Sequence, residues 1–390
     1  MSRSRTVLVA GAGIGGLAAA ISLAKAGFRV VVLERDSVPD TSGAGIQLSP
    51  NATRALQRLG VSETLRAVEP SELIVANAFS RAILARMPLG AVMRERFRSP
   101  YLVCLRADLH EALSRIAADH PDIELRYGHA LSDFALHGRG VTAEIERGRE
   151  IEEITGAALI GADGIRSRVR ARLHPGTAPR HGGMSAWRAT VPAASLPEEL
   201  QNDLQVRVWL GPGAHLVHYP VGASGDVNLV AVTMEKQPVE TWGEETPAEE
   251  VLHRFSRWHA APRSVLAAAK NFRRWSLFEA PPMTWWGKGA STLLGDAAHG
   301  MFPFLAQGAA AALEDAVTLS DQLRDTGDVP GTLRAYERLR IPRTQQIQSA
   351  ARNVGRIYHM PLPFSIGRDL VMERMGGAGL MRQNEWIYRW

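Results

Sequence analysis

The sequence is poor in cysteine, in lysine and in long apolar runs. Cys104 is the only cysteine among 390 residues, which excludes an internal disulfide and any metal or iron–sulfur site built from several cysteines. No run of about 18 apolar residues occurs, so we expect no membrane-spanning helix. The apolar stretch near the N-terminus is short and leads directly into a glycine motif, so we expect no signal peptide. These absences fit a cytoplasmic protein without a metal site.

Lysine is scarce because arginine supplies nearly all of the positive charge. The chain has 45 basic and 40 acidic residues, for a net charge of +5, and only four of the basic residues are lysine. A basic balance is the first sign of a nucleic-acid-binding protein. However, the arginines are scattered, and the densest cluster, at 166–170, lies inside a motif that has another explanation. We therefore expect no nucleic-acid partner.

The length predicts two domains, because one hydrophobic core stops growing at about 250 to 300 residues. Between residues 184 and 234, four strand-like segments follow one another with Pro/Gly turns and no helical segment between them. Runs of strands without alternating helices are typical of a separate antiparallel sheet. We expect the substrate domain there.

A nucleotide-binding motif opens the chain. The segment 6–10 is apolar and of strand type, and Gly11, Gly13 and Gly16 follow it as G-x-G-x-x-G before an Ala/Leu-rich helical segment. The first glycine permits the tight turn, the second lets the backbone approach a pyrophosphate, and the third lets the helix pack on the sheet. The next strand ends at Glu34, near the spacing at which an acid binds the adenosine ribose. The motif alone does not distinguish FAD from NAD.

Two later segments are open to two interpretations each. The loop around Gly45 and Gln47 is too rich in glycine for a plain strand, which indicates either close backbone approach to a planar ligand or a flexible surface loop. Arg106 begins a helical segment, from which it could reach a phosphate or form a surface salt bridge.

Two further strand ends place an acid beside glycine. The strand at 157–161 leads to Asp163, and the strand at 292–294 leads to Asp296. After Asp296, a proline-containing loop leads to an alanine-rich helix that begins near Gln307. A carboxylate here can accept from a ribitol or ribose hydroxyl, and the new helix's N-terminus can stabilise negative charge on a ligand.

Together these segments resemble the three flavin motifs of the single-component (class A) FAD-dependent aromatic hydroxylases. They read GAGIGG with Glu34, GADGIRSRVR, and GDAAHGMFPFLAQGAAAALEDA, and they span residues 6 to 316. The likeness is strongest to the branch of salicylate hydroxylase, 3-hydroxybenzoate 6-hydroxylase and 6-hydroxynicotinate 3-monooxygenase. That branch often has a proline where this chain has Gly300, so the loop should be looser here.

The resemblance implies an α/β fold with a glutathione-reductase-type FAD-binding domain, a second, antiparallel-sheet substrate domain and C-terminal helices. It implies one tightly held FAD, with NADH or NADPH and O2 as co-substrates. The predicted domains are 1–72, 98–180 and 275–335 for FAD, 73–97 and 181–274 for substrate, and 336–390 for the C-terminal helical region. The residues predicted to hold FAD are Gly11, Gly13, Ile14, Gly15, Gly16, Glu34, Arg35, Gly45, Gln47, Arg106, Asp163, Gly295, Asp296, Gln307 and Gly308.

The implied reaction is hydroxylation of a phenolic or hydroxypyridine aromatic acid through a flavin C4a-hydroperoxide. A phenol reacts far better as phenolate, so a base of near-neutral pKa is wanted, and histidine is the natural candidate. His215 and Tyr219 lie four positions apart in a strand-like segment and therefore on one face, whereas His218 would point the other way. By resemblance to the 6-hydroxynicotinate-type enzymes, His215 and Tyr219 face the substrate, and we predict both as catalytic residues.

The predicted substrate pocket is largely apolar and aromatic, as ligand pockets usually are. The residues predicted to line it are Gln47, Trp187, Pro303 and Phe304. Arg188 and Arg207 could each bind a substrate carboxylate, and the spacing does not choose between them. His299 is a competing base, although its place in a flavin motif favours a structural role.

Two other functions are consistent with the same motifs. The fold could serve epoxidation or N-hydroxylation, which need no phenolate and hence no His215. A flavin-binding protein without turnover, such as a redox sensor or a ligand-sequestering resistance protein, would keep the flavin motifs and consume no oxygen. We expect the hydroxylase, acting on a small aromatic substrate, and leave a homodimer open.

Overall fold

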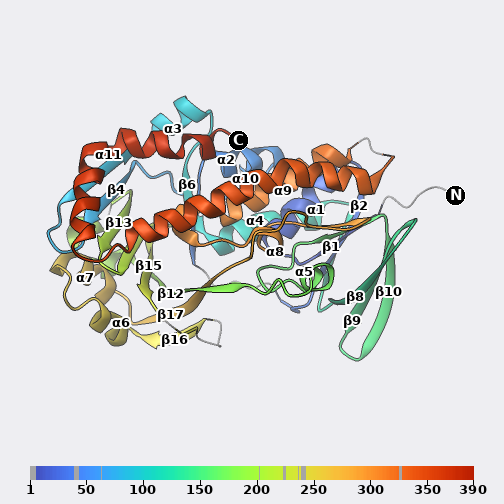
Figure 1. Ribbon diagram of the computed structural model, residues 1–390, viewed down its shortest axis with the longest axis horizontal. Coiled ribbons are helices and arrows are strands. Elements are labelled where there is room, and N and C mark those ends of the chain that lie inside the picture. The colour runs from blue at the N-terminus through green and yellow to red at the C-terminus, as the bar shows by residue number, and fades with distance from the viewer. Residues whose placement is uncertain are drawn as a thin grey trace.

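The structure is a computed structural model, and it describes residues 6–38, 44–62, 64–201, 203–222, 225–235, 237–238, 243–324 and 327–390. Over these residues the strands form four sheets, which contain five, eight, three and two strands. The five-stranded and eight-stranded sheets lie toward opposite ends of an elongated molecule, and the long helix α10 (Val329–Tyr358) runs beside both (Figure 1).

The five-stranded sheet is parallel throughout, in the order β18-β11-β1-β2-β7. Strands β1 and β2 are rich in Val and Leu and almost fully buried, as expected for a parallel sheet that is covered on both faces. Helix α1 packs on the sheet with α4 and α9 beside it, and a three-stranded antiparallel sheet, β8 to β10, packs against it as well. The bounds are β1 Thr6–Ala10, β2 Arg29–Glu34, β7 Ile123–Tyr127, β8 Ala130–His137, β9 Gly140–Arg147, β10 Glu150–Gly156, β11 Ala158–Gly161, β18 Ser291–Leu293, α1 Ile14–Lys25, α4 Arg106–Asp119 and α9 Gly308–Leu323.

The eight-stranded sheet has the order β16-β17-β12-β15-β14-β13-β4-β5. It is antiparallel except for β4 beside β13, which run parallel because the chain passes through the other half of the molecule between them. The bounds are β4 Glu72–Asn77, β5 Ile83–Pro88, β12 Arg180–Val191, β13 Gln205–Gly211, β14 Ala214–Val221, β15 Asp226–Met234, β16 Glu244–Pro247 and β17 Asn271–Glu279.

The two faces of this sheet bury different cores. One face packs against α6 (Ala248–Arg254) and α7 (Ala260–Ala267), with Trp187 and Leu216 in the shared core. The other face packs against the loop that contains Phe304 and against the C-terminal helices. The second face is turned toward the half of the molecule that contains the five-stranded sheet, so we call it the inner face.

Short elements connect the two halves. Strand β3 (Gly45–Leu48) pairs with β6 (Leu102–Leu105), and β6 packs against β14. The remaining helices are α2 Pro50–Leu59, α3 Gly90–Phe97, α5 Arg168–Leu173 and α8 Asp296–His299, with 3-10 turns at Ala193–Ser195, Glu198–Leu200 and Pro303–Leu305.

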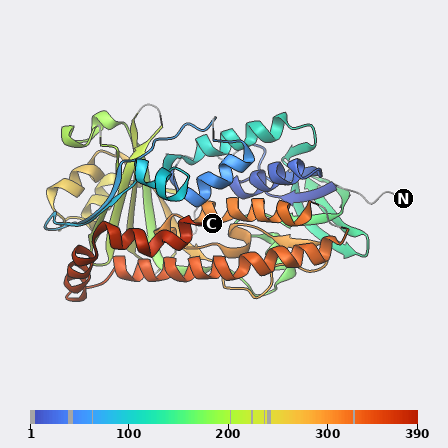
Figure 2. The same ribbon diagram turned by 90° about the horizontal axis from the view of Figure 1, so that it is seen from above.

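The C-terminal region is helical, as predicted. Helix α10 packs along α9, and α11 (Phe364–Tyr388) turns back at a kink at Gly376 to cover β5 (Figure 2). No helix in the described ranges is long and apolar enough to cross a membrane. The division into domains stays a prediction, and two of its boundaries fall inside elements, because residue 275 lies in β17 and residue 336 in α10.

Candidate active site

The turn between β1 and α1 leaves backbone N–H groups free for an anion. Among the described residues, no side chain caps α1 and no acid lies in its first turn. Gly11 has φ +100°, and a Cβ at Gly16 would overlap the Gly11 carbonyl oxygen, so local packing requires both glycines. At Gly13 no described atom lies within 4 Å of a Cβ position. The open space is therefore at the glycine that should face a pyrophosphate. Ile14 and Gly15, also predicted to hold FAD, begin α1 there.

Glu34 lies at the end of β2, directly beside this turn. Its carboxylate accepts hydrogen bonds from the backbone N–H of Ala12 at 2.8 Å and of Asp36 at 3.1 Å. A carboxylate has about four acceptor sites, so two backbone donors orient it and leave capacity for ribose hydroxyls. The adjacent Arg35 is mostly exposed, 3.5 Å from Asp36.

Asp296 lies close to the start of α9. The Asp296 side chain is exposed, yet surrounding protein raises the pKa of its carboxyl, against the opposing charges of His299, Arg106 and Arg170. Both observations hold if the carboxylate lines a deep opening. A Cβ at Gly308 would lie 3.8 Å from the Asp296 Oδ1 atom.

The N-terminus of α9 is likewise open to a ligand. Within the described part of the chain, no side chain caps it and its first turn contains no acid. A second uncapped helix N-terminus therefore lies beside Asp296 and could stabilise negative charge on a ligand.

The contacts of two predicted FAD residues give them structural roles. Asp163 accepts hydrogen bonds from the Ser167 hydroxyl and from the backbone N–H groups of Arg168 and Val169, so it caps the turn before α5. At Gly45, a Cβ would collide with Asn228 and Tyr219. This glycine is needed because two side chains of the eight-stranded sheet approach its backbone.

The inner face of the eight-stranded sheet brings together three polar side chains. His215 and Tyr219 lie on β14, both buried, and Arg188 lies two strands away on β12. From the strand spacing and register, the Cα atoms of His215 and Arg188 are about 12 Å apart. Arg188 lies over the Trp275 ring at 5.5 Å, its Nε is buried without a partner, and none of the described acids pairs with it. An unpaired arginine of this kind suits an anionic ligand.

Two other candidates, Trp187 and Arg207, lie on the opposite face of the sheet. Trp187 is fully buried against α6 and α7, with Arg254 and Arg274 over its ring. Trp187 therefore cannot line a pocket with His215. Arg207 pairs with Asp203 at 3.0 Å on that same face, so the structure favours Arg188 over Arg207 as a carboxylate ligand.

The inner face around His215 and Tyr219 is covered by Gln47 and by the loop before α9. Gln47 accepts from the Tyr101 hydroxyl at 2.7 Å and hydrogen-bonds Tyr219, whose pKa is raised by burial. Phe304, in the 3-10 turn that begins at Pro303, packs its ring 5.6 Å from that of His215. The structure thus gathers the predicted substrate residues, apart from Trp187, around His215 and Tyr219.

Known proteins with this arrangement carry a flavin. A model of the FAD binding domain family matches residues 4–351. The chain belongs to this family of flavoprotein monooxygenases. It is 38% identical to 3-hydroxybenzoate 6-hydroxylase of Klebsiella oxytoca, over 100% of this chain and 98% of the relative. It is 32% identical to 6-hydroxynicotinate 3-monooxygenase of Pseudomonas fluorescens, over 89% and 90%.

A solved structure confirms the fold of this flavoprotein monooxygenase. The substrate complex of salicylate hydroxylase superposes with a TM-score of 0.84 at 25% identity, covering 100% of this chain and 96% of that one. The predicted fold class, the FAD cofactor and the recognised family are thereby confirmed. The alternative of a flavin-binding protein without turnover is not favoured.

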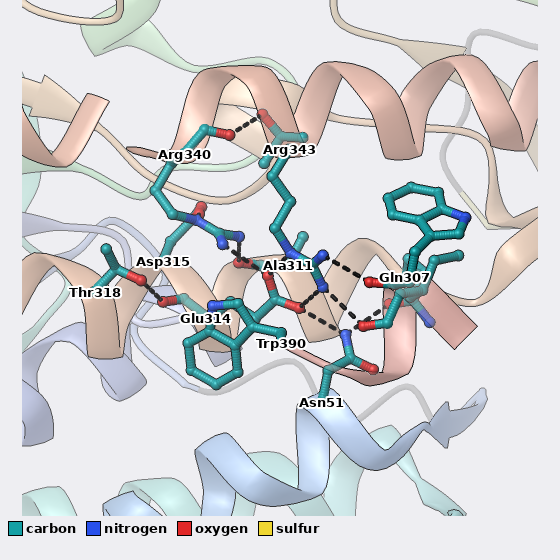
Figure 3. A network of polar contacts seen from close by, with 12 residues as sticks. Asn51, Gln307, Ala311, Glu314, Asp315, Thr318, Arg340, Arg343 and Trp390 are labelled. Atoms are coloured by element: carbon teal, nitrogen blue, oxygen red, sulfur yellow. Dashed lines mark hydrogen bonds and ion pairs between the residues drawn. The ribbon is translucent and has the colours of Figure 1, made fainter. Parts of the chain in front are cut away.

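A buried ionic network ties the start of α9 to the C-terminal helices (Figure 3). Glu314 and Asp315 on α9 are fully buried, and Arg340 on α10 donates to both, at 2.7 and 2.6 Å. Asp315 also binds His299 at 2.6 Å and the backbone N–H of Gly295 at 3.0 Å. His299 is therefore held as a structural partner of the turn that carries Asp296, and not as the base.

The same network fixes Gln307. Asn51 on α2 donates to Gln307 at 2.9 Å and to Glu314 at 2.7 Å. Arg343 joins Glu314 to backbone carbonyl oxygens of α11 at Trp386 and Ile387. The buried carboxylate of Glu314 thus connects the loop at Gln307 with helices α2, α10 and α11.

The loop at Gly300 is not loosened, contrary to the sequence-based expectation. The Ile165 side chain occupies the space that a Cβ of Gly300 would take. The backbone N–H of Gly300 donates to the backbone carbonyl oxygen of Asp296 at 3.2 Å, and the carbonyl oxygen of Gly300 accepts from Gln348 at 3.1 Å. A proline at this position would lose the first of these bonds.

We predict different effects of alanine at the two glycines of the first turn. Gly13→Ala adds a methyl group to open space, so the apoprotein should melt within about 2 °C of the native protein while FAD dissociates at least about tenfold more readily. Gly16→Ala should lower both properties because the new Cβ overlaps Gly11. Thermal melting with and without FAD, and flavin retained through gel filtration, measure the two effects. Equal FAD retention in Gly13→Ala and the native protein would contradict the pyrophosphate assignment.

Proposed function

We propose that this monooxygenase hydroxylates a phenolic or hydroxypyridine aromatic acid, with NADH or NADPH and O2 as co-substrates. One observation carries the proposal: a buried imidazole, His215, and a guanidinium without an acidic partner, Arg188, lie on the same face of the sheet. A substrate lying between them needs an ionisable hydroxyl at one end and an anionic group at the other. Both named relatives above act on a hydroxylated aromatic acid, which supports this choice.

The residues of the chain have separate roles in the reaction. FAD, when bound at the Gly13 turn and the start of α9, supplies the hydride acceptance and oxygen activation that no side chain can supply. His215 accepts the proton of the substrate hydroxyl and so makes the ring electron-rich. Arg188 holds the carboxylate and fixes the ring's orientation. Tyr219, whose pKa burial raises, stays protonated and acts as a hydrogen-bond donor, held by Gln47.

A panel of matched aromatic acids tests the proposal. Hydroxybenzoates and hydroxypyridine carboxylates should stimulate NADH oxidation and yield a product with one added oxygen. The corresponding methoxybenzoates, which have no phenolic proton, and hydroxybenzyl alcohols, which have no carboxylate, should do so poorly. Conversion of an alkene or an amine with no response to any hydroxylated acid would favour epoxidation or N-hydroxylation instead.

We predict that Arg188→Gln raises the KM for a hydroxybenzoate by about 10- to 100-fold, because hydrogen bonds to charged groups contribute about 1.5 to 3 kcal/mol. The KM for the matching hydroxybenzyl alcohol should change little. Arg207→Gln is the control, since Arg207 carries the same charge on the opposite face of the sheet. Steady-state kinetics of both variants with both substrates would show whether the effect belongs to the carboxylate or to stability.

We also propose that the protein is a homodimer. The first half of α11 exposes Phe364, Ile366, Leu370 and Val371, each with more than half of its surface open to solvent. Several large apolar side chains exposed on one short helical segment are typical of a protein interface. Light scattering should give twice the mass of the 390-residue chain, and Phe364→Glu with Leu370→Glu should give a monomer.

A cytoplasmic location is the last part of the proposal. Its support is Cys104, the single cysteine, which is buried as a free thiol with a pKa that burial raises. Such a thiol suits a reducing compartment. Fractionation of cells that express the tagged chain would test it.

A further inference from the structure

A second histidine touches the one that we assign as the base. His359 lies just beyond the end of α10, and its Nε2 atom is 2.8 Å from Nδ1 of His215. The two rings have centroids 4.9 Å apart, and Phe304 and Tyr358 pack edge-on around them. The pair joins the inner face of the eight-stranded sheet to the C-terminal region. Nothing in the spacing of the sequence suggests this contact.

We assign the protons of the two rings from their hydrogen bonds. The backbone of Gly355 hydrogen-bonds the His359 imidazole and raises its pKa, so a carbonyl oxygen accepts from that ring. With Nδ1 of His359 as this donor, its Nε2 accepts the Nδ1 proton of His215. Nε2 of His215 then carries no proton, and within the described chain no residue hydrogen-bonds it. A neutral histidine in this state can accept a proton only at Nε2.

Neither ring is suited to store a positive charge. Burial lowers the pKa of His215 well below its ordinary value, and the charge of His359 lowers it further. Burial lowers the pKa of His359 to about 4, which Gly355 opposes and the guanidinium of Arg368 reinforces. Arg368 is itself paired with Asp369 at 2.8 Å. His215 is 3% exposed, whereas His359 is partly exposed, so a proton passed to His359 lies closer to water.

We propose that His359 is a positioning residue that fixes the tautomer of His215 and relays the substrate's proton to solvent. The inference rests on the proposed function, since it presupposes a hydroxylated substrate at His215. The phenol O–H bond breaks as Nε2–H forms on His215. The Nδ1 proton of His215 moves to Nε2 of His359, and the Nδ1 proton of His359 leaves to water. One proton leaves the substrate and one reaches solvent, and both histidines end neutral. The Nε2–H of His215 then donates toward the phenolate, and the Nε2–H of His359 donates to Nδ1 of His215.

Two substitutions separate hydrogen bonding from proton transfer. The side chain of His359→Gln can accept from or donate to Nδ1 of His215, so it supports both tautomers, but it cannot carry a proton. His359→Leu can do neither. The measurement uses the oxidised holoenzyme with 4-hydroxy-3-nitrobenzoate, whose phenolate absorbs visible light, at a pH below the pKa of the free probe. Absorbance gives the ionised fraction of the bound probe, and an indicator dye in weak buffer gives the rate of proton release.

The relay predicts a split between these two quantities. His359→Gln should keep the ionised fraction within about threefold of the native value while proton release slows at least about tenfold and is restored by added imidazole. His359→Leu should lose both the ionised fraction and the rate, because the buried Nδ1 atom of His215 is left without a partner. Tyr358→Phe is the matched control, since it keeps the neighbouring ring contact and should change neither quantity.

The outcomes distinguish the relay from the function on which it rests. If the native holoenzyme binds the probe without ionising it, the assignment of His215 as base fails. If the native protein ionises the probe and His359→Gln releases protons at the native rate, the relay is overturned and the proposed function stands. Variants that lower only the melting temperature would likewise overturn the relay and leave His359 as a packing contact.

Discussion

His215→Ala is expected to slow hydroxylation by about 10²- to 10⁴-fold, the usual cost of losing a general base. FAD content should stay the same, because β14 contributes no residue to the Gly13 turn or to the start of α9. NADH oxidation should continue, with its electrons recovered as hydrogen peroxide in place of hydroxylated product. The decisive quantity is product formed per NADH consumed.

The pH dependence of this ratio should be absent in the native protein and present in the variant. Burial holds the pKa of His215 well below its ordinary value, so the native imidazole is already neutral and able to accept a proton across the neutral range. Native coupling should therefore be flat from about pH 7 to pH 9. In His215→Ala the ratio should rise over the same range, because solvent then removes the phenolic proton.

His218→Ala is the matched control for this experiment. His218 lies on the same strand and is equally buried, but it accepts a hydrogen bond from Trp209 on the opposite face. Burial and the charge of Arg207 lower its pKa to about 3. Its loss should lower stability and leave coupling unchanged. Unchanged coupling in His215→Ala at neutral pH would assign His215 to structure.

Much of the FAD half could be predicted because its signals are local. The glycine spacing, Glu34 at the end of the second strand, and the helix start near Gln307 are each set within a few residues of the chain. The alternation of side chains along a strand likewise placed His215 and Tyr219 on one face and His218 on the other. The structure has all three where the alternation puts them.

The sequence does not predict in the same way which residues of two separate strands lie on the same face of the sheet. Trp187 and Arg188 are neighbours, and only one of them can share a face with His215. Which one depends on how β12 pairs with β15 and on the register shift between His181 and Ser185. A one-residue slip exchanges the two faces. For this reason the sequence suggested both Trp187 and Arg188 for the substrate site, and the structure presents only Arg188 on the face of His215.

Long-range partners were also outside the reach of sequence patterns. His359 is 144 positions from His215, and Asn51 is 263 positions from Glu314. An Arg or a Glu inside a helical segment gives no sign of whether it is buried. The one available signal was the adjacent acid pair Glu314-Asp315, which follows an apolar, alanine-rich first half of α9 and indicates that nearby cations must lie within the core.

Arg340→Met should lower the free energy of unfolding by about 3 to 5 kcal/mol, which is the usual effect of removing one partner from a buried ion pair. Arg340 is 2% exposed and donates to two fully buried carboxylates, Glu314 and Asp315. Methionine fills the volume of the aliphatic stem, so the loss isolates the charge. FAD retention should fall as well, because Asp315 holds the Gly295 turn and Glu314 holds the Asn51–Gln307 pair.

The effect of Arg340→Met should also depend on pH. Burial raises the pKa of Asp315, but His299 and Arg340 outweigh it and hold the value at about 2. A carboxyl whose folded-state pKa is depressed contributes stability above its unfolded pKa, and this is lost as the pH falls toward about 2. Without Arg340 the folded-state pKa of Asp315 rises, so the variant should unfold at a higher pH on acidification.

Arg58→Met, which removes an exposed pair with Asp321, is the control and should cost at most about 1 kcal/mol. Urea unfolding of both variants at pH 7 and pH 4 measures these differences, and equal losses in the two would show that the buried network contributes no more than a surface pair.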